Sequence, residues 1–384
     1  MSVTPYRYAA PQAALDDLGQ RLRRSRWPDA LDHNGWQQGF ALAPLRQLCD
    51  YWASTFDWRA QEQRIFSFPH FRYTASGGLG IHFIHQRGQG PAPLPLVLTH
   101  GWPGSFLEML DLVPRLADPA RFSADPRDAF DVVVPSLPGF GFSDRPQAPG
   151  SNLFHAADLW AELMGALGYD RFAAQGGDFG ASVSTLLGLR HPQRLIGIHL
   201  NYIPGSYRPS LDPPAPPLTP EEEGFRAEAA RWADAEGAYA HLQRTYPQTL
   251  AYGLNDSPAA LAAWILEKFR NWGDCQGNLE CHFDRDWLLA NVTLYWLTQT
   301  IASSTRLYWE TARAPLRFAP GERVTVPVAV ARFPREAPFP PRPWVERCYN
   351  LERWTAMPRG GHFPALEEPD ALAADLRAFF RPLR

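Results

Sequence analysis

Asp178 stands in the stretch AAQGGDFGASVS (173–184), between an apolar run and a run of good helix formers. Its immediate surroundings, GGDFG (176–180), have the form of a nucleophile elbow, in which a tight turn between a strand and a helix requires small flanking residues. Gly176 and Gly180 meet that requirement. Taken alone, the pattern is equally compatible with a glycine-rich turn whose aspartate caps a helix. The neighbouring motifs decide between the two.

The motif HGWPGS (100–105) follows an earlier apolar run and predicts a loop that donates a backbone N–H group to an oxyanion hole. The second donor of such a hole comes from the residue after the nucleophile. We therefore expect the backbone donors to be those of Trp102 and Phe179.

His362, in RGGHFPALEEP (359–369), lies in a loop after the last expected strand, beside two glycines. In this architecture the chain order is nucleophile, acid, histidine, so the acid should follow the strand that resumes before His362. Glu336, in VARFPREAPFP (330–340), takes that place, whereas Glu367 and Asp370 come after the histidine and fit less well. The chain contains no G-x-S-x-G motif, which argues against a serine esterase.

A carboxylate nucleophile suits displacement at a saturated carbon better than acyl transfer. Asp178 would form an alkyl ester, and His362, oriented by Glu336, would activate the water that hydrolyses it. Two substrate classes fit, an epoxide or a carbon that bears a halide. An epoxide leaves as an alkoxide and needs strong donors such as tyrosine hydroxyls, whereas a halide needs only weak donors such as indole N–H groups.

The elements that would position these residues alternate between short apolar strands and amphipathic helices. Strand patterns lie in 94–105, 130–143, 171–180 and 194–205, and helical patterns separate them. This alternation predicts an α/β fold, an α/β-hydrolase core with a mostly parallel sheet. A proline-rich passage (209–225) opens a mainly helical block in which Thr219, Pro220 and Glu222 form a strong helix start. Strand patterns return at 323–334 and 352–357.

The predicted organisation is an N-terminal extension (1–90), a first part of the core (91–205), an inserted helical lid (206–320) and a second part of the core (321–384). The composition does not support a nucleic-acid-binding, membrane or metal-binding protein. The net charge of −3 gives no basic face for nucleic acid or an acidic membrane. The four cysteines form no metal-binding pattern, and neither a signal sequence nor an apolar run of membrane-spanning length occurs. We expect a cytoplasmic protein with free thiols and without a cofactor or a metal.

The motifs together resemble the microsomal-type epoxide hydrolases, the branch with an extended N-terminal region, and in particular its soluble bacterial members. The likeness covers nearly the whole chain. It is carried by RLRRSRWPDA (21–30), LCDYWASTFDWRAQEQRIFSFPHFR (48–72), HGWPGSF, GGDFG, LNDSPAALAAWILEKF (254–269) and RGGHFPALEEP.

The resemblance implies that Asp178 is the nucleophile, His362 the base and Glu336 the charge-relay acid. It also implies two lid tyrosines that assist ring opening. Tyr239, in EGAYAHLQ, matches the first. Tyr308, in STRLYWE, matches the second better than Tyr295, in TLYWLTQT, which stays open as the alternative.

Further expectations come from the resemblance alone. Residues 1–90 should wrap around the core and the lid, the substrate should be an apolar or aromatic small-molecule epoxide, and a homodimer is favoured. The membrane anchor of some members is not expected in this chain. Phe179 replaces the Trp or Ile of some members, which affects the pocket but not the backbone donor.

Two alternatives remain open at this point. A haloalkane or haloacid dehalogenase would share the Asp-His-acid set but would not need the lid tyrosines. A catalytically silent binding protein of the same fold would normally lack one member of that set. Halide release and a covalent ester on Asp178 are the observations that discriminate among the three hypotheses.

Overall fold

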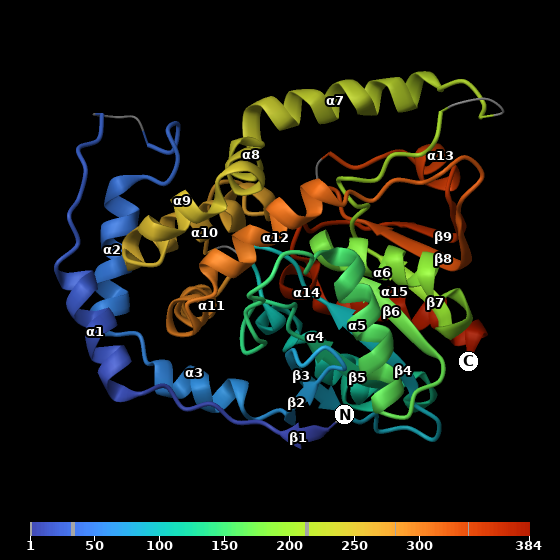
Figure 1. Cartoon of the computed structure of the whole chain (residues 1–384), viewed down its shortest axis with the longest axis horizontal. Helices are drawn as coiled ribbons and strands as arrows, with labels where there is room; N and C mark the ends of the chain where they lie inside the picture. Colours follow the sequence, from blue (N-terminus) through green and yellow to red (C-terminus); the bar gives the residue numbers. More distant parts are fainter. Residues whose placement is uncertain (1, 32–34, 212–214, 281, 337) are drawn as a thin grey trace.

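A twisted sheet forms the centre of the structure, a computed structural model that describes every residue except 1, 32–34, 212–214, 281 and 337 (Figure 1). Within the described residues the sheet has nine strands, in the order β1-β2-β3-β5-β4-β6-β7-β8-β9. The strands are β1 (Val3–Pro5), β2 (His70–Thr74), β3 (Gly80–Gln86), β4 (Leu94–Thr99), β5 (Phe130–Pro135), β6 (Phe172–Gly176), β7 (Leu195–Leu200), β8 (Val324–Arg332) and β9 (Tyr349–Ala356).

The strands β4 to β9 are parallel, whereas β1, β2 and β3 join antiparallel at one side through the pairing of β3 with β5. Every residue of β5, FDVVVP, is buried, as expected of a central strand covered on both faces. The predicted α/β-hydrolase core with a mostly parallel sheet is confirmed. The nucleophile motif follows β6, and the HGWPGS loop follows the adjacent β4, so both lie at the carboxyl edge of the sheet.

Helices cover both faces of the sheet. On one face, α5 (Leu153–Ala166) packs against α6 (Asp178–Arg190). On the other, α4 (Leu112–Ala117) packs against α15 (Pro369–Phe380). Side chains of β7 alternate between these layers, since a Cβ at Gly188 of α6 would touch Ile198, whereas His199 bonds to Asp375 of α15.

A helical block is inserted between β7 and β8 and lies along one side of the sheet (Figure 1). The capping box predicted for its first helix is confirmed, because Thr219 and Glu222 exchange side chain–backbone hydrogen bonds. The helices are α7 (Pro220–Glu236), α8 (Ala238–Thr245), α9 (Pro247–Leu254), α10 (Pro258–Trp272), α11 (Arg285–Thr298) and α12 (Ile301–Arg313).

The N-terminal segment contacts both the inserted helices and the sheet. Its helices are α1 (Gln12–Arg23), α2 (Leu42–Ser54) and α3 (Trp58–Ile65), of which α1 and α2 pack against α10, and α3 against α11. Trp52 of α2 donates its indole N–H to Thr293 of α11 at 3.0 Å. The same segment supplies β1, β2 and β3, so it ties the helical block to the edge of the sheet.

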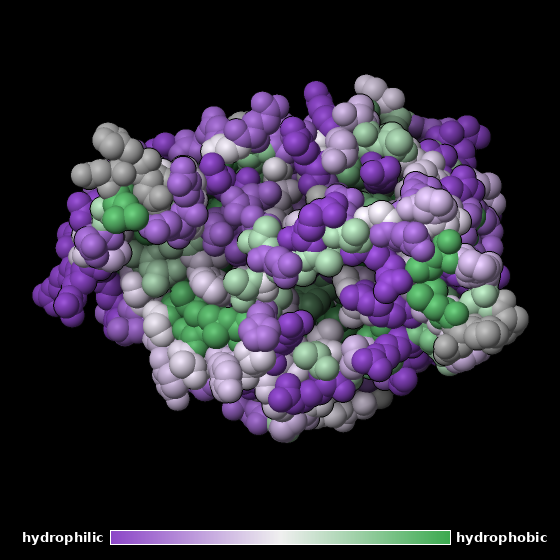
Figure 2. Space-filling model, turned by 90° about the horizontal axis from the view of Figure 1, so that it is seen from above, coloured by the Kyte–Doolittle hydropathy of each residue, from purple (hydrophilic) through white to green (hydrophobic). Residues whose placement is uncertain are grey.

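The surface seen in Figure 2 is largely hydrophilic, with apolar residues in separate patches. Among the described helices, none is both long and apolar enough to cross a membrane.

Candidate active site

Asp178 begins α6 directly after β6 and adopts a left-handed backbone conformation, with φ +46°. Such a conformation is strained for a residue with a side chain and is typical of functional turns. The two flanking glycines make the turn possible. A Cβ at Gly176 would collide with the backbone of Gly180, and one at Gly180 would collide with the carbonyl oxygen of Thr99. The turn therefore has the elbow geometry that holds one carboxylate above the edge of the sheet.

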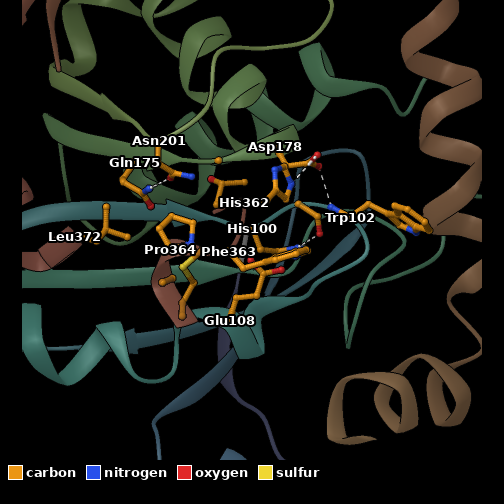
Figure 3. Close-up of a pocket in the computed structure, with 15 residues that line it drawn as sticks. His100, Trp102, Glu108, Gln175, Asp178, Asn201, His362, Phe363, Pro364 and Leu372 are labelled. Carbon is orange, nitrogen blue, oxygen red and sulfur yellow. Dashed lines mark hydrogen bonds and ion pairs between the residues drawn. The ribbon is translucent and has the colours of Figure 1, made fainter. Parts of the chain in front are cut away.

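Two backbone donors converge on one oxygen of the Asp178 carboxylate. Trp102 N–H donates to Oδ1 at 2.9 Å (Figure 3), and Phe179 N–H donates to the same oxygen at 2.7 Å. Gly101 permits this approach, because a Cβ there would overlap the Asp178 side chain. The structure thus places both predicted backbone donors at Asp178 and leaves Oδ2 free of them.

The helix α11 fixes the loop that carries Trp102. Asn291 donates to the carbonyl of Pro103 at 3.0 Å and accepts from the Ser105 hydroxyl at 2.8 Å. Tyr295 donates its hydroxyl to the carbonyl of Gly104 at 2.7 Å. All three bonds are buried. The hydrogen bond of the Tyr295 hydroxyl therefore serves to hold the loop.

His362 lies between two carboxylates. Its Nδ1–H donates to Glu336 at 2.8 Å, and its Nε2 is 3.5 Å from Asp178 Oδ2. Burial by itself would lower the pKa of His362, but the charges of Glu336 and Asp178 raise it well above the ordinary value of 6.5. The imidazole is thus oriented by one carboxylate and directed at the unbonded oxygen of the other.

Glu367 holds the loop of His362 in place and is not one of the two carboxylates that flank the imidazole. Its carboxylate accepts backbone N–H groups from Gly361 at 3.0 Å, Phe363 at 2.9 Å and Asp274 at 2.7 Å. The backbone N–H of His362 also donates to the carbonyl of Trp272, the last residue of α10, at 3.0 Å. The loop therefore rests on the end of a helix from the inserted block.

Tyr239 of α8 and Tyr308 of α12 meet above the elbow. Their phenol groups are close enough to affect each other's pKa, and their ring centroids are 5.9 Å apart. The ring of Tyr239 stacks on Trp102 with centroids 5.4 Å apart, and that of Tyr308 meets Phe179 at 4.8 Å. Burial, together with the charge of Asp178, raises the pKa of both phenols. Both are thus protonated donors at neutral pH.

Three further residues at the site were missed by the sequence analysis. Glu108, in the short helix η1 (Phe106–Met109), is buried near Asp178 and His362, and burial raises its pKa to about 8. The ring of Tyr202 meets that of His362 edge to face at 5.7 Å. Lys268 of α10 is 4 % exposed, with its Nζ 4.8 Å from the Tyr239 ring centroid. Only the spacing of Glu108 from the HGWPGS loop could have signalled any of them.

A small cavity lies behind Asp178 and His362 (Figure 3). Its volume is about 20 Å³, which suits about one water molecule and is too small for an organic substrate. Its polar lining residues are Thr99, His100, Glu108, Gln175, Asp178, Asn201 and His362. Tyr239 and Tyr308 are not among its lining residues.

Comparisons with known proteins match the chain along its length. The family model described as the epoxide hydrolase N terminus matches residues 3–109, and the α/β hydrolase fold model matches residues 95–249.

Curated relatives are similar over almost the whole chain. A protein of Stigmatella aurantiaca, provisionally named an epoxide hydrolase, is 46 % identical over 100 % of this chain and 86 % of its own. Epoxide hydrolase 1 of Oryctolagus cuniculus is 36 % identical over 98 % of this chain and 88 % of its own. Among solved structures, the epoxide hydrolase of Aspergillus niger is 32 % identical with a TM-score of 0.85, covering 100 % of this chain and 97 % of that one.

Proposed function

The chain belongs to the microsomal-type epoxide hydrolase family, and from this premise we propose that it converts an epoxide and water into a vicinal diol through an alkyl ester on Asp178. The observation that supports the proposal most is that the two oxygens of the Asp178 carboxylate have different partners. Oδ1 is held by two backbone donors, whereas Oδ2 has none and is the oxygen nearest to His362.

In the first half-reaction, Oδ2 of Asp178 attacks an epoxide carbon. A C–O bond forms at the carbon, the ring C–O bond breaks, and the released alkoxide takes a proton from the tyrosine pair. Because burial keeps both phenols protonated, they can donate as the negative charge develops on the oxygen. The remaining Asp178 oxygen, Oδ1, is then the carbonyl oxygen of the ester.

In the second half-reaction, a water molecule attacks Cγ of Asp178. His362 Nε2 takes a proton from this water, and Oδ1 becomes an oxyanion that accepts hydrogen bonds from Trp102 N–H and Phe179 N–H. The Cγ–Oδ2 bond then breaks, and the diol leaves with Oδ2 and the proton from His362. The second proton of the water, left on the new Asp178 carboxyl group, returns to the tyrosine pair, so that Asp178 and the tyrosines regain their starting protonation states. The new oxygen of Asp178 therefore comes from water.

The change of charge at Asp178 explains how one histidine can serve both steps. Before reaction His362 lies between two carboxylates, which hold its pKa high. Formation of the ester neutralises Asp178 and removes one of those charges, so the pKa of His362 falls. The imidazole becomes a base at the stage at which a base is needed.

Glu108 acts on the same water in this proposal. Its carboxyl lines the cavity next to His362, and its high pKa keeps it mostly protonated at neutral pH. A neutral carboxyl can both donate and accept a hydrogen bond, and it does not repel the Asp178 carboxylate. We assign Glu108 the orientation of the attacking water.

The tyrosine pair supports an epoxide rather than a halide as the reacting group. A halide leaves without a proton, so two neighbouring phenols beside Asp178 would have no function in a dehalogenase. The aromatic rings around the carboxylate also favour an apolar or aromatic substituent on the epoxide, since Trp102, Phe179 and Tyr308 pack at centroid distances of 4.8 to 5.7 Å.

The proposed domain roles follow from these contacts. Residues 206–320 form a lid that brings the two tyrosines to the core, and residues 1–90 brace the lid against the sheet.

Incubation with styrene oxide tests the proposed function. The wild-type protein should release the vicinal diol, and Asp178→Ala should release none. Conversion of a chlorinated alkane to an alcohol with release of chloride, without any diol from styrene oxide, would overturn the proposal in favour of a dehalogenase.

A further inference from the structure

A polar layer between the sheet and α15 adjoins the cavity behind Asp178 at Gln175. Gln175 of β6 lines the cavity and stands directly opposite His199 of β7 in the parallel register. Opposed residues of neighbouring strands point to the same face. His199 bonds to Asp375 of α15, so Gln175 and His199 both project into this layer. Neither side chain has any exposed surface.

Gln175 and His199 each have one buried polar atom without a hydrogen-bond partner among the described residues. Gln175 Nε2 donates to Asn201 Oδ1 at 2.7 Å, and His199 Nε2–H donates to the Asp375 carboxylate at 3.0 Å. Gln175 Oε1 and His199 Nδ1 have no hydrogen-bond partner among the residues that the structure describes. Leaving a buried polar atom unpaired costs about 1–3 kcal/mol. Two such atoms on adjacent strands therefore indicate a shared ligand.

The charges of the cluster identify what that ligand can be. Burial alone would raise the pKa of Asp375, but hydrogen bonds from His199, Arg353 and Thr355 hold it at about 2. The carboxylate is ionised and accepts the His199 Nε2–H, so in a neutral imidazole Nδ1 is an acceptor. Gln175 Oε1 is an acceptor too. One water molecule, with its two hydrogens, satisfies both atoms.

We propose that Gln175 and His199 bind a buried reserve water that refills the hydrolytic position beside His362 from the side opposite the substrate. The inference rests on the proposed function, because it concerns the water consumed in the second half-reaction. While the ester is present, the alkyl group occupies the side of Asp178 that faces Tyr239 and Tyr308. Water for its hydrolysis must therefore arrive from behind, where Gln175 forms part of the cavity wall.

Gln175 is a positioning residue in this proposal, so its removal should affect the two half-reactions differently. Gln175→Met keeps the length of the side chain and removes the amide. Rapid-quench measurement with styrene oxide, with the alkylated protein detected by mass, should show hydrolysis of the ester slowed about tenfold. Formation of the ester should change less than about twofold. Equal slowing of both steps, or no slowing of hydrolysis, would overturn the inference.

A second variant changes the wall of the cavity without removing a polar group. Ala365→Val adds methyl groups to the apolar wall of the cavity and should also slow hydrolysis selectively. Leu376→Met is the matched control, since Leu376 is buried on α15 but does not line the cavity. It should leave both rates unchanged. Equal rates in Ala365→Val and the control would count against a water site there.

A crystal structure of the wild-type protein decides the site independently of any activity. Electron density for a water within about 3.2 Å of both Gln175 Oε1 and His199 Nδ1 is the expected result. A direct contact between the two side chains, or a dry site, would overturn the inference. Failure of the wild-type protein to form an ester would instead overturn the proposed function. The crystal structure would then still decide whether the water is bound.

Discussion

At the scale of single residues, the site separates its tasks by the two oxygens of one carboxylate. Backbone N–H groups hold Oδ1 of Asp178, and the side chain of His362 faces Oδ2. Glu336 orients the imidazole from its other side at 2.8 Å. In the proposed mechanism, attack on the substrate and attack by water use this same carboxyl group in turn, without rearrangement of the donors.

His362→Gln should trap the ester, because glutamine cannot take the proton of the attacking water whereas Asp178 still carries its nucleophilic oxygen. We expect hydrolysis to slow by about 10²- to 10⁴-fold, while formation of the ester persists. Intact mass measurement after addition of styrene oxide should show one lasting adduct. If the adduct disappeared as fast as in the wild-type protein, His362 would not be the base.

The tyrosines should govern the opposite half-reaction. Tyr239→Phe or Tyr308→Phe should slow ester formation by about 10- to 100-fold each, since each removes one hydrogen bond to a developing charge. The double variant should be nearly inactive. Tyr246→Phe, at a residue 69 % exposed, is the control. Normal alkylation by the double variant in single-turnover kinetics would remove both tyrosines from the mechanism.

At the scale of elements, the loop that carries Trp102 depends on α11, a helix of the inserted block. Asn291 of α11 pairs with both Pro103 and Ser105, on either side of Gly104, and Tyr295 bonds to Gly104 between them. These bonds fix the loop that donates Trp102 N–H to Asp178. In the proposed mechanism, the inserted helical block therefore supports the backbone donors at Asp178 as well as the tyrosine pair.

Asn291→Ala should lower the free energy of unfolding by about 1–3 kcal/mol, because it leaves the buried Ser105 hydroxyl and the Pro103 carbonyl unpaired. Ester hydrolysis should slow by about tenfold as the Trp102 donor loosens. Denaturant titration and single-turnover kinetics measure the two effects. Asn271→Ala, on the exposed side of α10, is the control. A variant as stable and as fast as the wild-type protein would contradict this role of α11.

At the scale of the whole molecule, a buried histidine pair ties the N-terminal segment to the core. His70 of β2 donates to the carbonyl of Ile65 at 2.8 Å and accepts from His82 of β3, also at 2.8 Å. His82 in turn accepts from the Ser136 hydroxyl. Burial lowers the pKa of His70 to about 4 and places that of His82 well below its usual value. Both rings are neutral in the folded protein.

The stability of the whole fold should therefore fall in mild acid. Between pH 6.5 and pH 4 the unfolded chain binds protons at both histidines whereas the folded chain does not, so the contribution present above pH 6.5 is lost as the pH falls. The slope approaches about 1.4 kcal/mol per pH unit for each histidine. Denaturant unfolding as a function of pH measures it. His70→Gln should flatten the slope, and exposed His241→Gln should not. An unchanged slope in His70→Gln would contradict the assignment.

Patterns local in the sequence predicted much of this architecture, and contacts distant in the sequence account for what was missed. The alternation of apolar runs and helices predicted the parallel sheet, and small residues around Asp178 predicted the elbow. The strand β1 has only three residues, all exposed, and exists through its pairing with β2. No periodicity could have revealed it.

The candidate site shows the same difference between patterns that are local in the sequence and contacts that are distant in it. The loops of Trp102 and His362 carry glycine-rich motifs, and Glu108 follows the first of them closely in the sequence. The pairing of Gln175 with His199, in contrast, arises only from packing between elements. Spacing alone could not choose between Tyr295 and Tyr308, since both lie on lid helices. The structure bonds the Tyr295 hydroxyl to the Gly104 carbonyl and packs the Tyr308 ring against those of Tyr239 and Phe179.

The most direct test of the ester mechanism is a single turnover of styrene oxide in ¹⁸O-labelled water, with enzyme in excess over substrate. The mechanism predicts label in the carboxyl group of Asp178, found by mass analysis of its peptide, and an unlabelled diol. Label in the diol and none in Asp178 would mean direct attack of water on the epoxide. That result would contradict the ester mechanism and the role of Asp178 as its nucleophile.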